Sequence, residues 1–353
     1  MVDEKDLVFM SFVAEDYSRS AVIRGKLTYS EFILVPPPSL KLLVFLLKFR
    51  RKRKLRGKTI VVMSPCHTLV PILRLTMNCQ IVLDAGWPLL DGAISRNIFN
   101  STFWRIKYFK YWCIDFICFK LANKVAFESE SQKHKSSKQF ALSEDKVFIS
   151  YSGFAENQIK PFRSNQDCLL INFCPKCQGA EYKIVLFRGK YNFEAGVEII
   201  DAAANKIKEK NIKFVFATSS LPKEFKFTSN PIVIRDFLTY NQMRHLYEIS
   251  SVTIGQVSED IRLNFTIPHK AFEAAFFGTP YVTRDALGIR ELFESPTQAI
   301  FYEPRKITLD ALISSAVEDE ILLESVAKSA RIRYNEVASQ SVITENFLKN
   351  ISN

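Results

Sequence analysis

One stretch of the sequence combines residue types that suit a phosphate site. In FTIPHKAFEAAFFGTPYVTRDALGIRELF (265–293), Pro268 opens a predicted helix, and Gly278-Thr-Pro leads from it into a buried strand. Lys270 and Glu273 are three residues apart, so both lie on one helical face near the N-terminus. That end of a helix carries partial positive charge and free N–H groups. The stretch therefore predicts an anion-binding helix between two strands.

The predicted helix belongs to a chain in which short apolar, β-rich runs alternate with helical stretches. Six runs fall in the first half, at 6–12, 31–37, 59–65, 80–86, 124–129 and 146–153. Six more fall in the second half, at 183–190, 213–220, 232–238, 252–257, 280–285 and 299–304. Nearly continuous apolar runs indicate strands buried on both faces, and the alternation indicates parallel sheets. We predict an α/β protein with two doubly wound, Rossmann-like domains facing a cleft.

The domain boundaries follow from length and from one polar segment. A chain of 353 residues exceeds the size at which a single core stops growing. The segment NQIKPFRSNQDC (157–168) separates the two sets of strands, and the sequence is helical from about residue 318. We predict a first domain over 1–160, a second over 161–330, and a C-terminal helix over 331–353 that can cross back to the first domain.

The charge is unevenly divided between these halves. The net charge is +11; residues 1–160 hold 25 Lys and Arg against 14 Asp and Glu, whereas residues 161–353 hold 23 of each. A basic half joined to a neutral half indicates two different tasks. The start MVDEKD does not resemble a secretory signal, and no run reaches the roughly 20 apolar residues of a spanning helix. Seven Cys without a regular framework favour reduced thiols in a cytoplasm.

A dense basic block lies in the first half, in SLKLLVFLLKFRRKRKLRGK (39–58). Its apolar run is too short to span a bilayer, and Leu and Phe beside Lys and Arg fit a helix that lies in an anionic membrane surface. The residues predicted to dock there are Lys48, Arg50, Arg51, Lys52, Arg53 and Lys54. A solvated helix face is the plainer interpretation, and a nucleic-acid site usually brings aromatic residues between the basic ones. We predict a cytoplasmic protein held peripherally at the inner face of the membrane.

The stretch that carries Lys270 and Glu273 resembles the donor-binding motif of GT-B glycosyltransferases, particularly those of family four. The shared features are a Pro-x-Lys-x-x-Glu-Ala helix, a Gly-x-Pro turn, a strand and a second Glu. VLFRGKYNFEAGVEIIDAAA (185–204) is similar to the first strand and loop of the donor domain, and ISYSGFAE (149–156) to the strand before the interdomain linker. IVLDAGWPLLDGAISR (81–96) and EDYSRSAVIRGKL (15–27) resemble acceptor-domain segments.

The resemblance implies roles for residues of the second half. Glu273 matches the carboxylate that grips the ribose hydroxyls of a nucleotide sugar, since a carboxylate accepts two hydrogen bonds from a diol. Lys190 matches the basic residue that neutralises the diphosphate, and Gly189 lets the backbone approach it. The loop from Asp285 to Glu291 would cover the sugar and phosphates. Lys270 joins these residues as a donor-binding residue.

The sequence departs from the family pattern in three places. Phe265 stands where the family often has a first Glu, and Ala195 stands where it has a Lys. No Gly-rich loop follows the first strand. Arg262, just before the motif helix, could replace the lost positive charge. The chain has no Asp-x-Asp motif, and for this family neither a metal nor another cofactor is expected.

In the first half, the resemblance points to a polar loop after one strand. Asp84 ends the strand on the side that faces the cleft, and Asp91 and Arg96 follow. A carboxylate there could orient or deprotonate an acceptor hydroxyl, or stabilise an oxocarbenium-like transition state. Asp84 and Asp91 are therefore the candidate catalytic residues, although Asp84 could also cap the turn that follows it.

The pair Cys174 and Cys177 forms a Cys-Pro-Lys-Cys sequence, for which we expect an ordinary loop, since a structural zinc site needs a second pair.

Together these observations predict a hexosyl or glycosyltransferase for polysaccharide biosynthesis. It would move a monosaccharide from a nucleotide sugar to an acceptor hydroxyl. The resemblance to family four further implies a lipid-linked glycan as acceptor, a reaction without a metal, and retention of configuration. The alternatives are a non-catalytic GT-B binding or scaffold protein, which the departures at Phe265 and Ala195 leave open, and a basic nucleic-acid-binding protein. A hydrolase or epimerase on the same scaffold is a lesser alternative.

Overall fold

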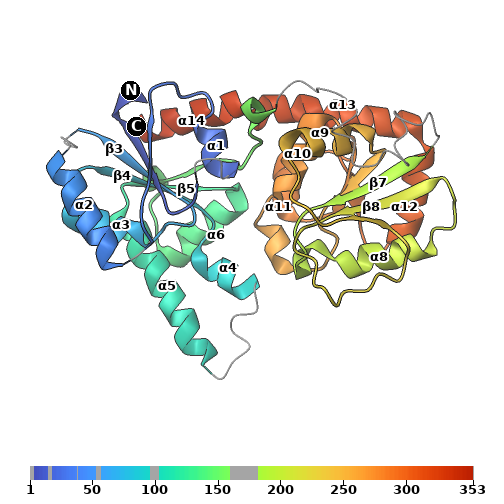
Figure 1. The fold of residues 1–353 in the computed structure, drawn as a ribbon, viewed down its shortest axis with the longest axis horizontal. Coiled ribbons are helices and arrows are strands. Elements are labelled where there is room, and N and C mark those ends of the chain that lie inside the picture. The colour runs from blue at the N-terminus through green and yellow to red at the C-terminus, as the bar shows by residue number, and fades with distance from the viewer. Residues whose placement is uncertain are drawn as a thin grey trace. The chain divides into compact units, whose positions relative to one another are not determined.

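The computed structural model describes residues 4–14, 18–37, 39–52, 57–95, 103–159 and 182–352. The chain forms two compact units (Figure 1). Unit 1 consists of residues Met1–Ala155 and Gln340–Asn353, and unit 2 consists of Glu156–Ser339. The side chains of Arg50, Arg51 and Lys52, and all of Arg53, Lys54, Arg96, Cys174 and Cys177, lie outside the described part.

Unit 1 is built on a parallel sheet whose strand order is β2-β1-β3-β4-β5-β6. The strands are β1 (Leu7–Ser11), β2 (Glu31–Leu34), β3 (Thr59–Met63), β4 (Gln80–Gly86), β5 (Lys124–Phe127) and β6 (Val147–Ile149). Each of the six apolar runs predicted for this half contains one of them. The residues of β1 and β3 are buried throughout, as expected for strands covered on both faces.

Helices cover both faces of this sheet. One core joins the sheet to four helices, α2 (Leu40–Lys52), α3 (Leu69–Thr76), α5 (Trp104–Leu121) and α6 (Glu130–Phe140). A second core joins it to two others, α1 (Ser18–Arg24) and α14 (Gln340–Ser352). The short helix α4 (Leu89–Ser95) follows β4 and packs against α5.

Unit 2 is built on a second parallel sheet, in the order β12-β11-β10-β7-β8-β9. Its strands are β7 (Lys183–Arg188), β8 (Ile212–Ala217), β9 (Ile232–Ile234), β10 (Val252–Ile254), β11 (Tyr281–Arg284) and β12 (Ile300–Tyr302). Its helices are α8 (Val197–Lys206), α9 (Tyr240–Ile249), α10 (His269–Phe277), α11 (Leu287–Leu292), α12 (Leu309–Glu318) and α13 (Glu320–Val337). This is the Rossmann order, whose direction reverses between β7 and β10. A ligand is therefore expected beyond the carboxyl ends of those two strands.

Five 3₁₀ turns complete the described elements: η1 (Glu4–Asp6), η2 (Glu144–Lys146), η3 (Glu156–Gln158), η5 (Phe193–Ala195) and η6 (Ile261–Asn264).

The C-terminal segment differs from the single helix expected over 331–353. It is divided between α13, which packs on α10 in unit 2, and α14, which belongs to unit 1. The Gln340 side-chain amide donates to the carbonyl oxygens of Ala21 and Val22 at 2.9 and 3.2 Å, and the Thr344 hydroxyl donates to that of Ile23 at 3.1 Å. These bonds satisfy carbonyls at the end of α1 and hold the last helix in the first unit. In the described part of the chain, no helix is long and apolar enough to cross a membrane.

Candidate functional site

The candidate site of unit 2 begins where β7 ends, at Gly189. This residue has φ +152°, which side-chain-bearing residues rarely adopt, and its N–H donates to the Ala217 carbonyl at 3.1 Å. A Cβ atom at Gly189 would lie 3.1 Å from Nζ of Lys270. The absence of a side chain therefore lets a lysine amine come directly against the backbone at the point where the strand order reverses.

Lys270 and Glu273 lie in α10, as the sequence predicts. The helix begins after Pro268 and ends at Gly278, whose φ of +69° closes it in a left-handed conformation. Both charged residues are buried, with 6% and 1% of their surfaces exposed. Buried charges are rare in proteins unless they are paired or functional, so the partners of these two residues are informative.

Lys270 has no hydrogen-bond partner among the described residues. Its Nζ lies 4.1 Å from the centre of the Phe187 ring. Burial, together with the charge of Arg188, lowers the pKa of Lys270 to about 7, against the opposing effect of Glu273 and Glu194. A buried amine without an acceptor is costly, and an anion at this point would remove that cost.

Glu273, in contrast, is fully engaged by protein groups. Arg188 Nη1 donates to its two carboxylate oxygens at 2.6 and 2.9 Å, the Tyr247 hydroxyl donates to Oε2 at 2.7 Å, and His269 Nδ1 lies 3.0 Å from Oε1. Burial favours the neutral acid, but Arg188 and the bonds from His269 and Tyr247 outweigh it and lower the pKa of Glu273 to about 2. A carboxylate offers about four lone-pair sites, and these contacts occupy them. Glu273 therefore holds Arg188 in place, and its role as a ribose ligand stays a prediction.

A second ion pair lies beside this group. Arg262 Nη1 bonds to Glu194 Oε1, and the backbone N–H of Arg262 donates to the Asp260 side chain at 2.8 Å. Ala195, which stands in the place of the family's Lys, is buried at the end of η5. The charge of Glu194 favours the protonated form of Lys270. The Arg262–Glu194 and Arg188–Glu273 pairs therefore form one cluster with Lys270, and its cations are Arg188, Arg262 and Lys270.

The remaining predicted donor residues lie on the surface of unit 2. Lys190 is exposed, directly after Gly189. Asp285 accepts two hydrogen bonds from Arg290, at 2.7 and 2.8 Å, which lower the pKa of Asp285. Glu291 is half-buried in α11. The predicted covering loop is thus a short helix closed by an ion pair, and its contacts with a sugar stay a prediction.

In unit 1, the candidate Asp84 forms a buried ion pair. It is fully buried at the end of β4, and Arg19 donates to both of its oxygens, from Nε at 2.8 and 3.0 Å and from Nη2 at 2.5 Å. Arg19 also donates to Ser152 Oγ at 3.1 Å and to the Ser150 carbonyl at 2.9 Å. Asp84 therefore ties α1 to the ends of the strands, which is a structural task, and its catalytic role stays a prediction.

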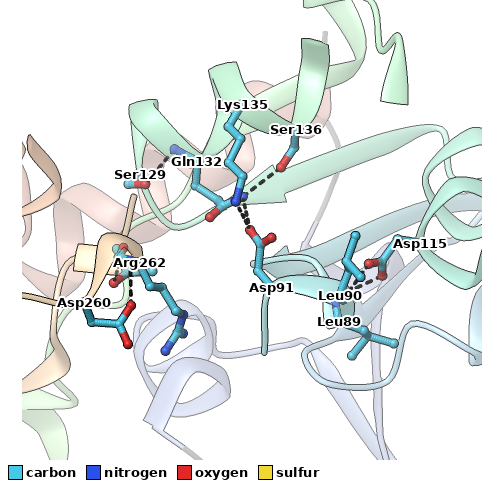
Figure 2. A network of polar contacts seen from close by, with 11 residues as sticks. Leu89, Leu90, Asp91, Asp115, Ser129, Gln132, Lys135, Ser136, Asp260 and Arg262 are labelled. Carbon is cyan, nitrogen blue, oxygen red and sulfur yellow. Dashed lines mark hydrogen bonds and ion pairs between the residues drawn. The ribbon is translucent and has the colours of Figure 1, made fainter. Parts of the chain in front are cut away.

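Asp91, the other candidate, lies in α4 and is 6% exposed. Figure 2 shows its carboxylate against α6, where Lys135 Nζ donates to Oδ2 at 2.8 Å and Gln132 Nε2 donates to it at 3.1 Å. Asp115 of α5 holds the start of α4, because its two carboxylate oxygens accept hydrogen bonds from the N–H groups of Leu89 and Leu90 at 3.0 and 2.9 Å. Burial outweighs these bonds and raises the pKa of Asp115 to about 7.

The predicted membrane-docking block begins on a surface helix. In α2, Leu42, Leu46 and Phe49 are in the core of unit 1, and Lys48 is exposed. Of the six basic residues predicted to dock, Lys48 alone has a described side chain. Among the described residues, no group of three or more His, Cys, Asp or Glu side chains is placed to hold a metal ion.

Comparison with known proteins concerns the fold and the domain that holds this cluster. Residues 197–344, which include Lys270 and Glu273, match a family model described as glycosyl transferase-like. The chain resembles HepE from Anabaena, solved in complex with UDP, with 13% identity, a TM-score of 0.70, and 98% of this chain and 99% of that chain covered. The chain therefore has the GT-B fold of these structures and contains a glycosyl transferase-like domain.

Two further solved structures share the fold of this chain. Sucrose-phosphate synthase from Thermosynechococcus elongatus has 12% identity and a TM-score of 0.69, with 98% of each chain covered. A glycosyltransferase from Rickettsia africae has 12% identity and a TM-score of 0.65, with 97% of this chain and 96% of that chain covered. No curated protein sequence matches the chain.

Sequence reasoning missed four residues that complete the two clusters: Arg188, Tyr247 and His269 around Glu273, and Arg19 on Asp84. A strand-end arginine one residue before a glycine was a usable signal for Arg188. Tyr247 and Arg19 gave none, since they are distant in sequence from the carboxylates they bind.

Proposed function

We propose that this protein is a glycosyltransferase that transfers a monosaccharide from a UDP-sugar to an acceptor hydroxyl. The observation that carries the proposal is the buried Lys270 amine, which finds no hydrogen-bond partner in the described part of the chain and lies against Gly189 at the point where the strand order of unit 2 reverses. That position is where a Rossmann-like sheet binds the phosphates of a nucleotide. UDP is the nucleotide in the complexes of HepE, including one with UDP-glucose.

The cluster suits a diphosphate leaving group. When the bond between sugar and diphosphate breaks, negative charge develops on the departing phosphate, and fixed cations stabilise it. Lys270 would supply one such cation in place of the Lys that the family has at Ala195. Arg188, held by Glu273, would supply another. Because side chains and the N-terminus of α10 can provide this charge, we propose a reaction that needs no metal.

We place the acceptor in unit 1 and propose a lipid-linked glycan. The support is the concentration of positive charge in the first half of the chain, which favours an anionic lipid surface. Transfer is proposed to proceed with retention of the anomeric configuration, as the resemblance to family four implies. Nuclear magnetic resonance of the first product formed would give its configuration, and an inverted product would refute this part of the proposal.

The decisive experiment is a screen of UDP-, GDP- and ADP-sugars by thermal shift, followed by mass spectrometry of transfer and hydrolysis products. A UDP-sugar should raise the melting temperature of the wild-type protein, and Lys270→Met should abolish that rise. Lys206→Met is the matched control, because Lys206 is an exposed lysine of the same unit and is 62% exposed in its ion pair with Asp310. If Lys270→Met bound UDP-sugars as the wild type does, the proposed site would be wrong.

The non-catalytic alternative is tested by the same screen. A binding or scaffold protein would be stabilised by a UDP-sugar but would neither transfer nor hydrolyse the sugar with any acceptor fraction. Phe265 is the residue to change in that case, since the family often has a Glu in its place.

A further inference from the structure

The two halves of α5 have opposite surroundings. Its C-terminal half packs into the hydrophobic core of unit 1 through Cys118 and Phe119, and Asp115 is buried there. Residues 103–110, at its N-terminal end, are all exposed. In Figure 1 this end of α5 extends away from the strands of its own unit. We call residues 103–110 the α5 tip.

The α5 tip exposes large apolar side chains on every side of the helix. The exposed fractions are 65% for Phe103, 45% for Trp104, 66% for Ile106, 38% for Tyr108 and 64% for Phe109. At 100° per residue these five positions surround the helix axis instead of forming one stripe. A helix that is apolar on all sides is normally buried, so such exposure indicates a surface that is covered during function.

The charges of the tip indicate what covers it. Arg105, Lys107 and Lys110 are interleaved with the aromatic residues, and no acidic residue occurs from 103 to 114. The core of a protein–protein interface is depleted in lysine. Lys and Arg beside Trp and Tyr are, however, the composition of the membrane–water boundary, where the charged ends extend to the headgroups and the rings lie below them.

The tip is firmly mounted on unit 1. Trp112 stacks between Phe109 and Phe116, with ring centres 6.3 and 5.0 Å away, and also contacts Phe140 of the core at 6.1 Å. The seven helical residues of the tip, Trp104–Lys110, extend roughly 10 Å. That length is comparable to the depth of roughly 5–10 Å at which interfacial helices bury their apolar groups.

We propose that the α5 tip inserts end-on into an anionic membrane surface and that unit 1 is anchored there. Because the apolar residues surround the axis, the helix would enter by its end, whereas α2 was expected to lie flat. The inference specifies the surface for the membrane location proposed above and rests on that location, but it does not depend on glycosyl transfer.

The test is co-sedimentation of the full chain with vesicles of phosphatidylcholine alone or with phosphatidylglycerol added. Replacing Trp104, Ile106 and Phe109 together by Ser should weaken binding to anionic vesicles by at least about 100-fold, since each large apolar side chain contributes to burial. Replacing Lys107 and Lys110 together by Gln should weaken it by about 30-fold. Leu75→Ser is the matched control, because Leu75 of α3 is an 86% exposed apolar residue outside the tip, and it should bind as the wild type does.

Three outcomes would overturn the inference: a wild-type protein that does not bind anionic vesicles, a Ser variant that binds them undiminished, or a Ser variant whose only change is loss of self-association in light scattering. Stabilisation by a UDP-sugar is measured on each variant. If the tip variants keep that stabilisation but lose vesicle binding, the tip is the docking surface. If no UDP-sugar stabilises any of the proteins while vesicle binding behaves as expected, the proposed donor fails and the docking surface stands.

Discussion

Donor binding should depend on pH because Lys270 must gain a proton to meet a diphosphate. In the folded protein, burial and Arg188 lower the pKa of Lys270 to about 7 from its usual 10.5. A bound diphosphate favours the charged amine and returns the pKa toward its ordinary range. Above about pH 7 binding therefore takes up a proton, and affinity falls as pH rises. The diphosphate of a nucleotide sugar stays ionised throughout, so the ligand does not contribute to this change.

The size of the effect follows from the fraction of Lys270 that is charged before binding. With a pKa of about 7, that fraction is roughly 0.76 at about pH 6.5 and roughly 0.03 at about pH 8.5. If the bound amine stays charged, the dissociation constant of a UDP-sugar rises about 25-fold between these conditions, equivalent to about 1.9 kcal/mol. A lysine with its ordinary pKa would give almost no change over the same interval.

Isothermal titration calorimetry measures both consequences. The dissociation constant is followed from about pH 6.5 to about pH 8.5, and proton uptake is obtained by repeating the titration in buffers of different ionisation enthalpy. Lys270→Met should bind weakly at every pH and take up no proton. Lys190→Met, which removes an exposed lysine beside Gly189, should bind more weakly but keep the pH dependence. A wild-type affinity that is constant over this interval, or a Lys270→Met variant that keeps the dependence, would refute the reasoning.

Three further changes test the surroundings of both clusters. Glu273→Gln should lower the free energy of unfolding by about 3 kcal/mol, because it leaves Arg188 without its partner. Since the pKa of Glu273 is lowered to about 2, the wild type loses this stabilisation as pH falls from about 4.5 toward 2. Urea unfolding of the variant should lack that loss of stability in acid. Asp115→Asn should flatten the pH dependence of stability between about pH 4 and 7. Because the pKa of Asp115 is raised to about 7, its neutral carboxyl stabilises the fold below its ordinary pKa, and this stabilisation is lost as pH rises to about 7. A urea-unfolding profile over pH that is the same in the variant and the wild type would contradict this. Gly189→Ala should cost about 1–3 kcal/mol in backbone strain and weaken UDP-sugar binding, because the new methyl group meets Lys270 Nζ; calorimetry showing wild-type affinity would count against the close approach.

The strands of the described residues could be predicted because each lies in an apolar run, and most are buried on both faces of a parallel sheet, which leaves a local signature. The position of α10 was likewise readable from Pro268 and Gly278, whose backbone preferences begin and end a helix. The division of the C-terminal segment between the two units could not be predicted from the sequence. That division depends on Gln340 and Thr344 bonding to the end of α1, more than 300 residues earlier in the chain, and no local pattern reports such a partner.

What the sequence alone determined is the alternation of strands and helices, the charge difference between the halves, and the presence of Lys270 and Glu273 on one turn of a helix. These follow from local periodicity and composition. The tertiary structure decided which charges are paired: Glu273 is bound by Arg188, whereas no described residue provides an acceptor for Lys270. It also decided that one end of α5 is buried and the other exposed, although both are rich in aromatic residues. Pairing and burial depend on residues distant in sequence, which only folding brings together.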